Sequence, residues 1–174
     1  MENEFINNDG TLKIMPSENS SAKDFDFLHG NWTIHNRKLK SRLTGSDEWT
    51  EFRAEQDCGP LLFGQANIDK FKTDAFGAPF EAMALRLFDP ATRLWSLYWA
   101  DSNVVVMDTP QVGSFDGTTG SFLARDVYNG KDIIVRFRWD LSDLEAPQWS
   151  QAFSEDEGAT WEWNWFMTFT RKGE

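Results

Sequence analysis

Short runs in which apolar and polar residues alternate recur along the chain from Trp32 onward. No window of about ten residues keeps apolar side chains at the i, i+3, i+4 and i+7 spacing of an amphipathic helix. The runs are instead rich in Val, Ile, Phe, Trp and Thr, and residues that favour turns separate them. The predicted strands cover residues 31–42, 48–57, 64–71, 80–89, 94–101, 103–108, 111–116, 119–128, 132–141, 147–154 and 161–171. This pattern predicts an all-β protein.

The connections between the predicted strands are short and carry turn chemistry. Asp116-Gly117 and Asn129-Gly130 supply residues that adopt the positive φ angles of tight hairpins at little steric cost. Neighbouring strands should therefore pair antiparallel in an up-and-down order. A meander of about ten strands removes its exposed edges by closing on itself. We therefore expect a single antiparallel β-barrel of about ten strands.

The N-terminal part differs in composition from the rest. Residues 1–22 are rich in Asn, Ser and acidic residues with little periodicity, which predicts a flexible tail ahead of a barrel domain over residues 23–174. The segment 24–30 starts with an acidic residue, contains Phe25, Phe27 and Leu28, and ends with a glycine. This predicts a short N-terminal helical plug.

Charge and cysteine content narrow the classes of partner. The 174 residues include 17 Lys and Arg against 28 Asp and Glu, a formal net charge of −11, and form no basic stripe. Binding to nucleic acid or to an anionic membrane needs such a stripe, so neither partner is expected. A single cysteine, Cys58, excludes an intrachain disulfide, and no signal-like or membrane-spanning apolar run is present. We expect a cytoplasmic protein.

The sequence contains no recognisable motif for binding a metal ion or a cofactor. The two histidines, His29 and His35, have no His or Cys at metal-ligand spacing, and no glycine-rich phosphate loop occurs. Cys58 precedes Gly-Pro in a turn and is interpreted as an ordinary thiol. We expect no metal and no cofactor, and catalytic residues stay unassigned.

Arginines among apolar residues are the best candidates for ligand contacts. Alternation places Arg86 on the face of Phe80 and Phe88, and it places Arg136 and Arg138 on the face opposite Ile133, Val135 and Phe137. If these faces point inward, each guanidinium needs a carboxylate or an anionic ligand; if they point outward, the arginines are solvated. The candidate ligand-binding set adds polar and aromatic residues of nearby strands: Arg86, Tyr98, Arg136, Arg138, Gln151, Glu162 and Trp163.

The last strand is unusually aromatic. Strict alternation puts Trp161, Trp163, Trp165, Met167 and Phe169 on one face, which we expect to fill the barrel wall. The preceding segment 154–161 has the pattern S-x-D-x-G-x-x-W, which is similar to the Asp-box of sialidase propeller blades and predicts a braced hairpin turn.

The opening of the domain, Phe27-Leu28-x-Gly30-x-Trp32, resembles the calycin superfamily of lipocalins and fatty-acid-binding proteins. The resemblance implies that Trp32 lies at the barrel base and that Arg171 of the last strand covers it as a cation–π pair. The D-F-x-F-L-x-G-x-W opening, Arg86-x-Phe88-Asp89, Trp99-x-Asp101 and the S-x-D-x-G-x-T-W-E closing together resemble a bacterial lipocalin-like family of unknown function, the DUF1579 type, over residues 24–172. The related nitrobindin-like barrels hold haem through a late histidine, and here no histidine follows residue 35.

Three functions remain open. The first is binding of a small, mainly hydrophobic ligand with an acidic head group held by arginine. The second is a filled barrel that acts as a protein-interaction module, with a homodimer as its expected assembly. The third is a small-molecule isomerase, decarboxylase or dehydratase in which Glu162, Tyr98 and an arginine meet in one cavity. Whether the protein is an enzyme is left undecided.

Overall fold

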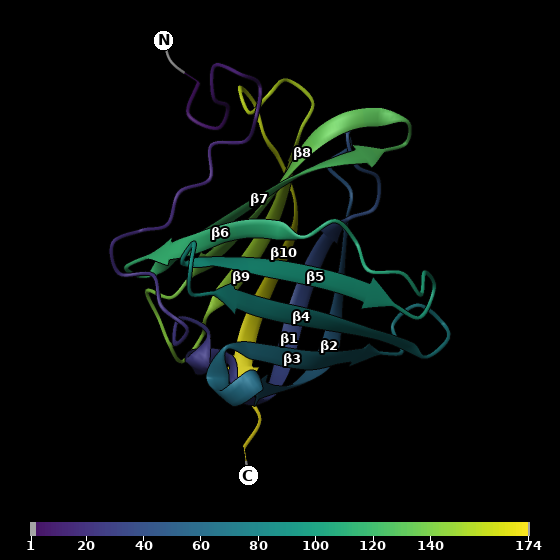
Figure 1. The fold of residues 1–174 in the computed structure, drawn as a ribbon. Helices are drawn as coiled ribbons and strands as arrows, with labels where there is room; N and C mark the ends of the chain where they lie inside the picture. The colour runs from purple at the N-terminus through teal and green to yellow at the C-terminus, as the bar shows by residue number, and fades with distance from the viewer. Residues whose placement is uncertain (1–2, 174) are drawn as a thin grey trace.

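The computed structural model describes residues 3–173 and contains a closed barrel of ten antiparallel strands in up-and-down order (Figure 1). Each strand pairs with its neighbours in the chain, and the last strand pairs with the first, which closes the barrel. The all-β up-and-down barrel is confirmed. Residues 1–2 and 174, at the extremes of the predicted tail and domain, lie outside the described residues. The strands are β1 (Gly30–Leu39), β2 (Trp49–Leu61), β3 (Ala66–Thr73), β4 (Phe80–Asp89), β5 (Leu94–Asp101), β6 (Gln111–Asp116), β7 (Thr119–Tyr128), β8 (Lys131–Asp140), β9 (Gln148–Ser154) and β10 (Glu162–Arg171).

Two predicted elements are wrong. The apolar run 103–108 is not a strand but part of the loop between β5 and β6, where Val104, Val105 and Val106 are exposed. The two strands pair only over residues 95–97 and 111–113, so the chain leaves the wall at this point. The predicted helical plug is a single 3-10 turn, η1 (Asp26–Leu28), because the chain enters β1 before a second turn can form.

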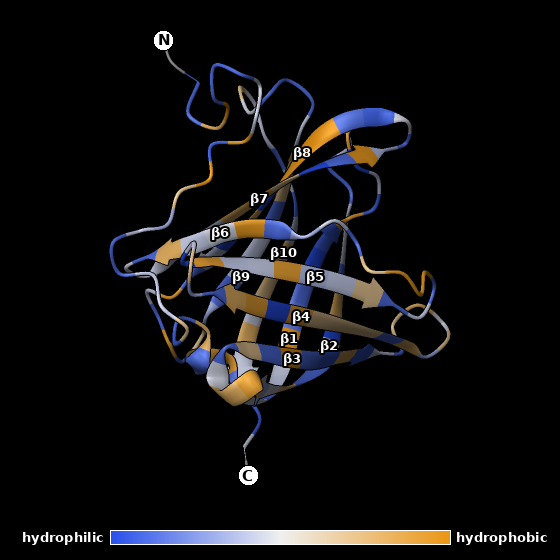
Figure 2. Ribbon diagram, viewed as in Figure 1, coloured by the Kyte–Doolittle hydropathy of each residue, from blue (hydrophilic) through white to orange (hydrophobic). Residues whose placement is uncertain are grey.

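The interior holds the hydrophobic core. Figure 2 shows that hydrophobic and hydrophilic residues are interspersed along the strands. One end of the barrel, which we call the floor, is closed by Phe25, Leu28 and Trp32, all of which are fully buried. The Phe25 ring packs edge-on against Trp95 at a centroid distance of 4.9 Å, and the Trp32 indole N–H donates to the Leu28 carbonyl over 2.8 Å. The segment before β1 therefore seals the floor with side chains.

The predicted lock on the floor is confirmed. The Arg171 guanidinium lies 4.1 Å from the centroid of the Trp32 ring. It also donates hydrogen bonds to the carbonyl oxygens of His29 (2.7 Å) and Phe27 (2.8 Å). Arg171 thus ties the end of β10 to the chain that enters β1.

The opposite end, which we call the mouth, is formed by the loops β1–β2, β3–β4, β5–β6, β7–β8 and β9–β10. The β9–β10 loop is the predicted braced turn: Asp156 accepts hydrogen bonds from the Ser154 hydroxyl and the Thr160 amide, each 2.8 Å long. The braced turn is confirmed.

A β-bulge in β10 changes which of its side chains face the interior. The register with β9 shifts between Trp163 and Trp165, so that Asn164 and Trp165 both lie on the inner side. Trp161 and Trp163 lie on the outer side, where they flank Arg136. The prediction of one continuous aromatic face is wrong because a bulge inverts the alternation of side chains beyond it.

The described part of the N-terminal segment runs along the outside of the barrel toward the floor (Figure 1). Asn3 donates to the Glu157 carbonyl over 2.9 Å, the Phe5 ring packs against Trp161, and the Ser20 hydroxyl donates to the Arg93 carbonyl. The flexibility of this segment in solution stays a prediction. Among residues 3–173, no helix is long and apolar enough to cross a bilayer.

Candidate functional site

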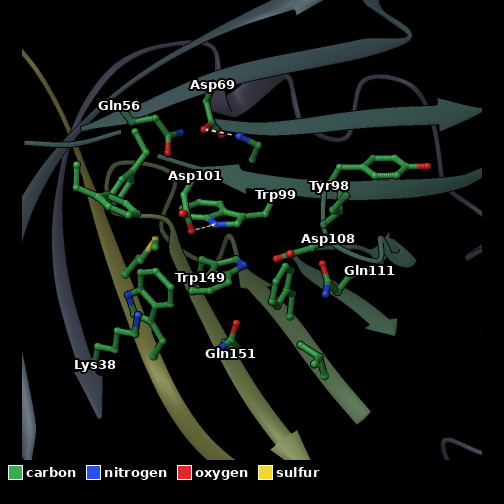
Figure 3. Close-up of a pocket in the computed structure, with 18 of the residues that line it drawn as sticks. Lys38, Gln56, Asp69, Tyr98, Trp99, Asp101, Asp108, Gln111, Trp149 and Gln151 are labelled. Atoms are coloured by element: carbon green, nitrogen blue, oxygen red, sulfur yellow. Dashed lines mark hydrogen bonds between the residues drawn. The ribbon is translucent and has the colours of Figure 1, made fainter. Parts of the chain in front are cut away.

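The barrel encloses a cavity of about 610 Å³ that opens at the mouth. Many of the side chains that line it are large aromatics, among them residues of β3, β5, β8, β9 and β10, and charged residues lie at its two ends. Figure 3 shows Lys38, Trp99, Trp149 and Gln151 directed toward a common space. The interior is therefore not filled by its own side chains.

The deep end of the cavity contains a buried ion pair. Arg86 on β4 donates to the Asp69 carboxylate on β3 with an Nη2–Oδ2 distance of 2.6 Å, and to the Asn67 side-chain oxygen over 2.9 Å. The exposed fractions of the Arg86 and Asp69 side chains are 8% and 1%. Burial raises the pKa of Asp69, whereas the charge and hydrogen bond of Arg86 lower it. The pair supplies a polar surface without net charge.

Two cations near the mouth, Lys38 and Arg42, form no salt bridge within the described residues. Lys38 at the end of β1 has its Nζ 4.0 Å from the centroid of the Trp165 ring, and Arg42 lies over the rings of Tyr128 and Phe153 at 5.6 and 5.5 Å. Neither forms a salt bridge with any residue between 3 and 173. Burial is the main cause that lowers the pKa of both groups, that of Lys38 to about 8. Both line the cavity.

Three acidic residues line the mouth as well. Asp101 accepts the indole N–H of Trp99 over 3.2 Å and two backbone amides of the following loop. Burial, together with the charges of Asp126 and Asp101, raises the pKa of Asp108. The mouth thus presents charges of both signs to a ligand.

Amide side chains add hydrogen-bonding groups to the wall. Gln151 donates to the Asn164 side-chain oxygen over 2.8 Å, and Trp165 donates to Asn36 over 3.0 Å. The Gln56 side chain lines the cavity, is almost fully buried, and its Nε2 has no hydrogen-bond partner within the described chain. A buried donor without a partner costs about 1–3 kcal/mol, so a ligand acceptor would stabilise it.

The structure brings only two of the predicted site residues together in the interior. Arg86 and Gln151 line the cavity. Tyr98 borders it, but its ring points away in Figure 3 because Leu97 and Trp99 occupy the inner face. Glu162 lies at the mouth and accepts the Leu43 amide over 2.9 Å.

The other three predicted residues lie outside the barrel. Arg136 and Trp163 contact each other on the outer surface, and Arg138 shares their side of the wall, opposite the buried Trp139. Glu162, Tyr98 and an arginine therefore do not converge in one cavity, and the enzyme hypothesis based on them is not carried further. Within the described residues, no group of three or more His, Cys, Asp or Glu could hold a metal ion.

Sequence reasoning missed Lys38 and Arg42. The signal for Lys38 was present, because alternation from Trp32 through Ile34 and Asn36 leads directly to it. Arg42 lies beyond the end of β1, in a loop where alternation gives no direction.

Neither a protein-family model nor a curated protein sequence matches this chain. Among solved structures, the fold is similar to that of Rv2717c from M. tuberculosis, with a TM-score of 0.57 and 12% identity over 87% of this chain and 98% of that one. It is also similar to the S-type phycobiliprotein lyase CPES from Guillardia theta, with a TM-score of 0.58 and 9% identity over 90% of this chain and 95% of that one.

At these identities the likeness shows the fold alone. Together with the ten-strand closed topology, it fits a lipocalin-like barrel fold.

Proposed function

We propose that this chain binds a small, mainly hydrophobic ligand with an anionic group inside the barrel cavity. The observation that carries the proposal is an open cavity of about 610 Å³ with two unpaired cations, Lys38 and Arg42, at its mouth. Small-molecule sites typically have volumes of about 300–1,000 Å³, aromatic walls and a few oriented polar groups. The cavity has each of these properties.

The position of the cations decides where the anionic group would lie. Partial burial of a cation is unfavourable unless a counter-charge offsets it. The ring faces that contact Lys38 and Arg42, and the charges of Asp101 and Glu162 beyond salt-bridge distance, supply part of that compensation. A carboxylate, sulfate or phosphate of the ligand between them would supply the rest. Arg86 and Gln151 stay in the proposed site as polar contacts deeper in the cavity, where the charge of Arg86 is already balanced by Asp69.

Two finer assignments belong to this proposal. The ordered motifs from Asp24 to Glu162 support a place in the DUF1579-type family, and the single buried Cys58 supports the cytoplasm as the compartment. A solved barrel of the same fold is named a phycobiliprotein lyase, which supports a small-molecule role for this kind of barrel. Its 9% identity carries no particular ligand over to this chain.

The first experiment is native mass spectrometry of gently purified protein, followed by denaturation and identification of any released molecule. The head-group assignment is then tested by tryptophan fluorescence titrations with dodecanoate and with dodecanol, its uncharged counterpart. Arg42→Ala should weaken dodecanoate about ten-fold, which corresponds to about 1.4 kcal/mol, and should leave dodecanol unchanged.

Arg37→Ala is the matched control. Arg37 precedes Lys38 on β1, lies on the outer face, and also stacks 4.0 Å from a tryptophan ring, that of Trp49. Its replacement should affect neither probe. Equal dodecanoate affinity in the wild type, Arg42→Ala and Lys38→Ala would contradict the proposal.

A second candidate function is protein interaction through the mouth loop. The cavity is inconsistent with a filled barrel. However, Val104, Val105 and Val106 in the β5–β6 loop expose 58%, 86% and 66% of their surface. Contiguous exposed apolar residues often mark interaction sites. Light scattering over a range of protein concentrations tests for a homodimer, and Val105→Asp should abolish it; a monomer at every concentration removes this candidate.

A further inference from the structure

Lys38 differs from the other described lysines because it lines the cavity in the barrel. The chain has eight lysines, and of these Lys40, Lys72, Lys131 and Lys172 form salt bridges at the surface. Lys38 pairs in register with Trp165 and directs its Nζ over that ring, into the cavity. It forms no hydrogen bond to any acceptor in residues 3–173. The described contact of its amine is therefore with the face of the ring and not with a hydrogen-bond acceptor.

The surroundings of Lys38 favour the neutral amine on balance, with burial as the largest cause, although the face of Trp165 favours the ammonium. Burial and then the positive charge of Arg42 lower its pKa from 10.5 to about 8, and Asp101 on β5 opposes this. At pH 7 a pKa of about 8 leaves about a tenth of the amine neutral, whereas a pKa of 10.5 leaves about three parts in ten thousand. The fraction of neutral amine is therefore much higher than for an ordinary lysine. A desolvated lysine beside another cation is a typical amine nucleophile.

We propose that Lys38 captures an aldehyde or ketone group of a cavity ligand as a reversible imine, so that the barrel is a site for carbonyl compounds. The proposal rests on the proposed function, because the ligand must first occupy the cavity. The neutral Nζ attacks the carbonyl carbon, the carbonyl oxygen takes up a proton, and the carbinolamine then loses one water molecule to form the C=N bond. The overall reaction joins amine and carbonyl, releases water, and needs no oxidant or reductant.

The cavity also defines the rest of the ligand. The Trp165 face that holds the ammonium can hold the protonated imine in the same way, and Asp101 at the mouth lowers the energy of that positive charge. Arg42 offers a second contact for an anionic group on the same ligand. The class of ligand is therefore an aromatic or otherwise hydrophobic carbonyl compound that carries an acidic group.

The test is reductive trapping on the full-length protein. The protein is incubated with para-formylbenzoate and sodium cyanoborohydride at about pH 7, and the modified lysines are located by peptide mass spectrometry. We expect a secondary-amine adduct at Lys38 at least about ten-fold faster than at Lys40, with a rate that levels off above about pH 8. The expected factor is smaller than the gain in neutral amine, because a less basic amine is also less nucleophilic. Modification of Lys38 no faster than that of Lys40 would overturn the proposal.

Lys40 is a matched control because it lies two residues further along the same segment, exposed and paired with Glu48 over 3.4 Å. Lys38→Arg keeps the charge but removes the nucleophile, so the rapid adduct should vanish while Lys40 reacts as before. Tryptophan fluorescence checks that this variant is folded. If it is not, the comparison within the wild type still decides the question.

A non-carbonyl analogue separates the two proposals. Para-(hydroxymethyl)benzoate has the same ring and carboxylate but cannot form an imine, and it should slow the labelling of Lys38 by occupying the cavity. If it binds and Lys38 is not trapped, the imine is refuted while the proposed ligand site stands. If Lys38 is trapped rapidly and neither compound changes the fluorescence, the failure concerns the anion-binding function alone.

Discussion

Replacing Arg86 by methionine should destabilise the protein strongly at neutral pH. The substitution removes the 2.6 Å ion pair with Asp69 and the hydrogen bond to Asn67, and it leaves the Asp69 carboxylate 1% exposed. The remaining hydrogen bond to Asp69 is that from the Ala84 amide, 3.2 Å long. Loss of one partner from a buried ion pair costs about 3–5 kcal/mol, because the other charge stays buried without compensation. We expect a decrease of this size in the free energy of unfolding.

The decrease should depend on pH, and its sign follows from the pKa of Asp69. Burial raises that pKa, and the Arg86 guanidinium is the first group that lowers it, so its removal raises the folded-state pKa further above the unfolded value. An acid with a raised folded-state pKa binds its proton more tightly in the folded state. The destabilisation is therefore complete at pH values above the folded-state pKa and shrinks as the pH falls through it toward the unfolded value. The variant should lose less stability relative to wild type at about pH 4.5 than at about pH 7.5.

Urea unfolding followed by tryptophan fluorescence measures both quantities. The double variant Arg86→Met with Asp69→Leu removes both charges and should be more stable than Arg86→Met alone, as expected when apolar residues replace a buried pair. A decrease below about 1 kcal/mol for Arg86→Met, or one that is equal at the two pH values, would refute the reasoning.

Further predictions concern the wall, the thiol and the floor. Gly113→Ala should prevent folding or cost at least about 3 kcal/mol, because its Cβ would collide with the backbone of β7. Gly59→Ala is the control: its Cβ meets no atom, so it should change the free energy of unfolding by less than about 1 kcal/mol. Similar urea midpoints for the two variants would contradict the close packing of β6 against β7. Burial raises the pKa of the Cys58 thiol to about 12, so a disulfide reagent at about pH 8 should react only after unfolding, and rapid reaction of native protein would exclude the buried position. Arg171→Ala should lower the free energy of unfolding by about 1–2 kcal/mol, since it loses the contact with Trp32 and two hydrogen bonds; an unchanged melting temperature would argue against the lock.

The strand order of the barrel could be predicted because its determinants are local. Asp116-Gly117 and Asn129-Gly130 both lie in the short turns between antiparallel strands, and both glycines have positive φ angles. Short turns leave each strand little choice of neighbour, so the meander follows from the sequence without knowledge of distant contacts. The lock between Trp32 and Arg171 came from resemblance to a known family rather than from any local rule.

The orientation of individual side chains could not be predicted with the same success. On β8, Ile133, Ile134 and Val135 are all apolar and all buried, so composition does not indicate which face is inner, and Arg136 could not be assigned. On β10 the bulge near Asn164 has no signature in the sequence, and it reverses the position of Trp163. The prediction of site residues on β8 and β10 depended on which of the two alternating sets of side chains faces the interior.

The closure of one end of the barrel has a kinetic consequence. Because Phe25, Leu28 and Trp32 seal the floor, a bound molecule can leave only past the mouth loops that carry Phe76 and Asp108. A competitor in solution cannot enter the cavity through the floor while the first ligand is bound. Dissociation should therefore be first order, with a residence time independent of competitor concentration and set by the opening of those loops.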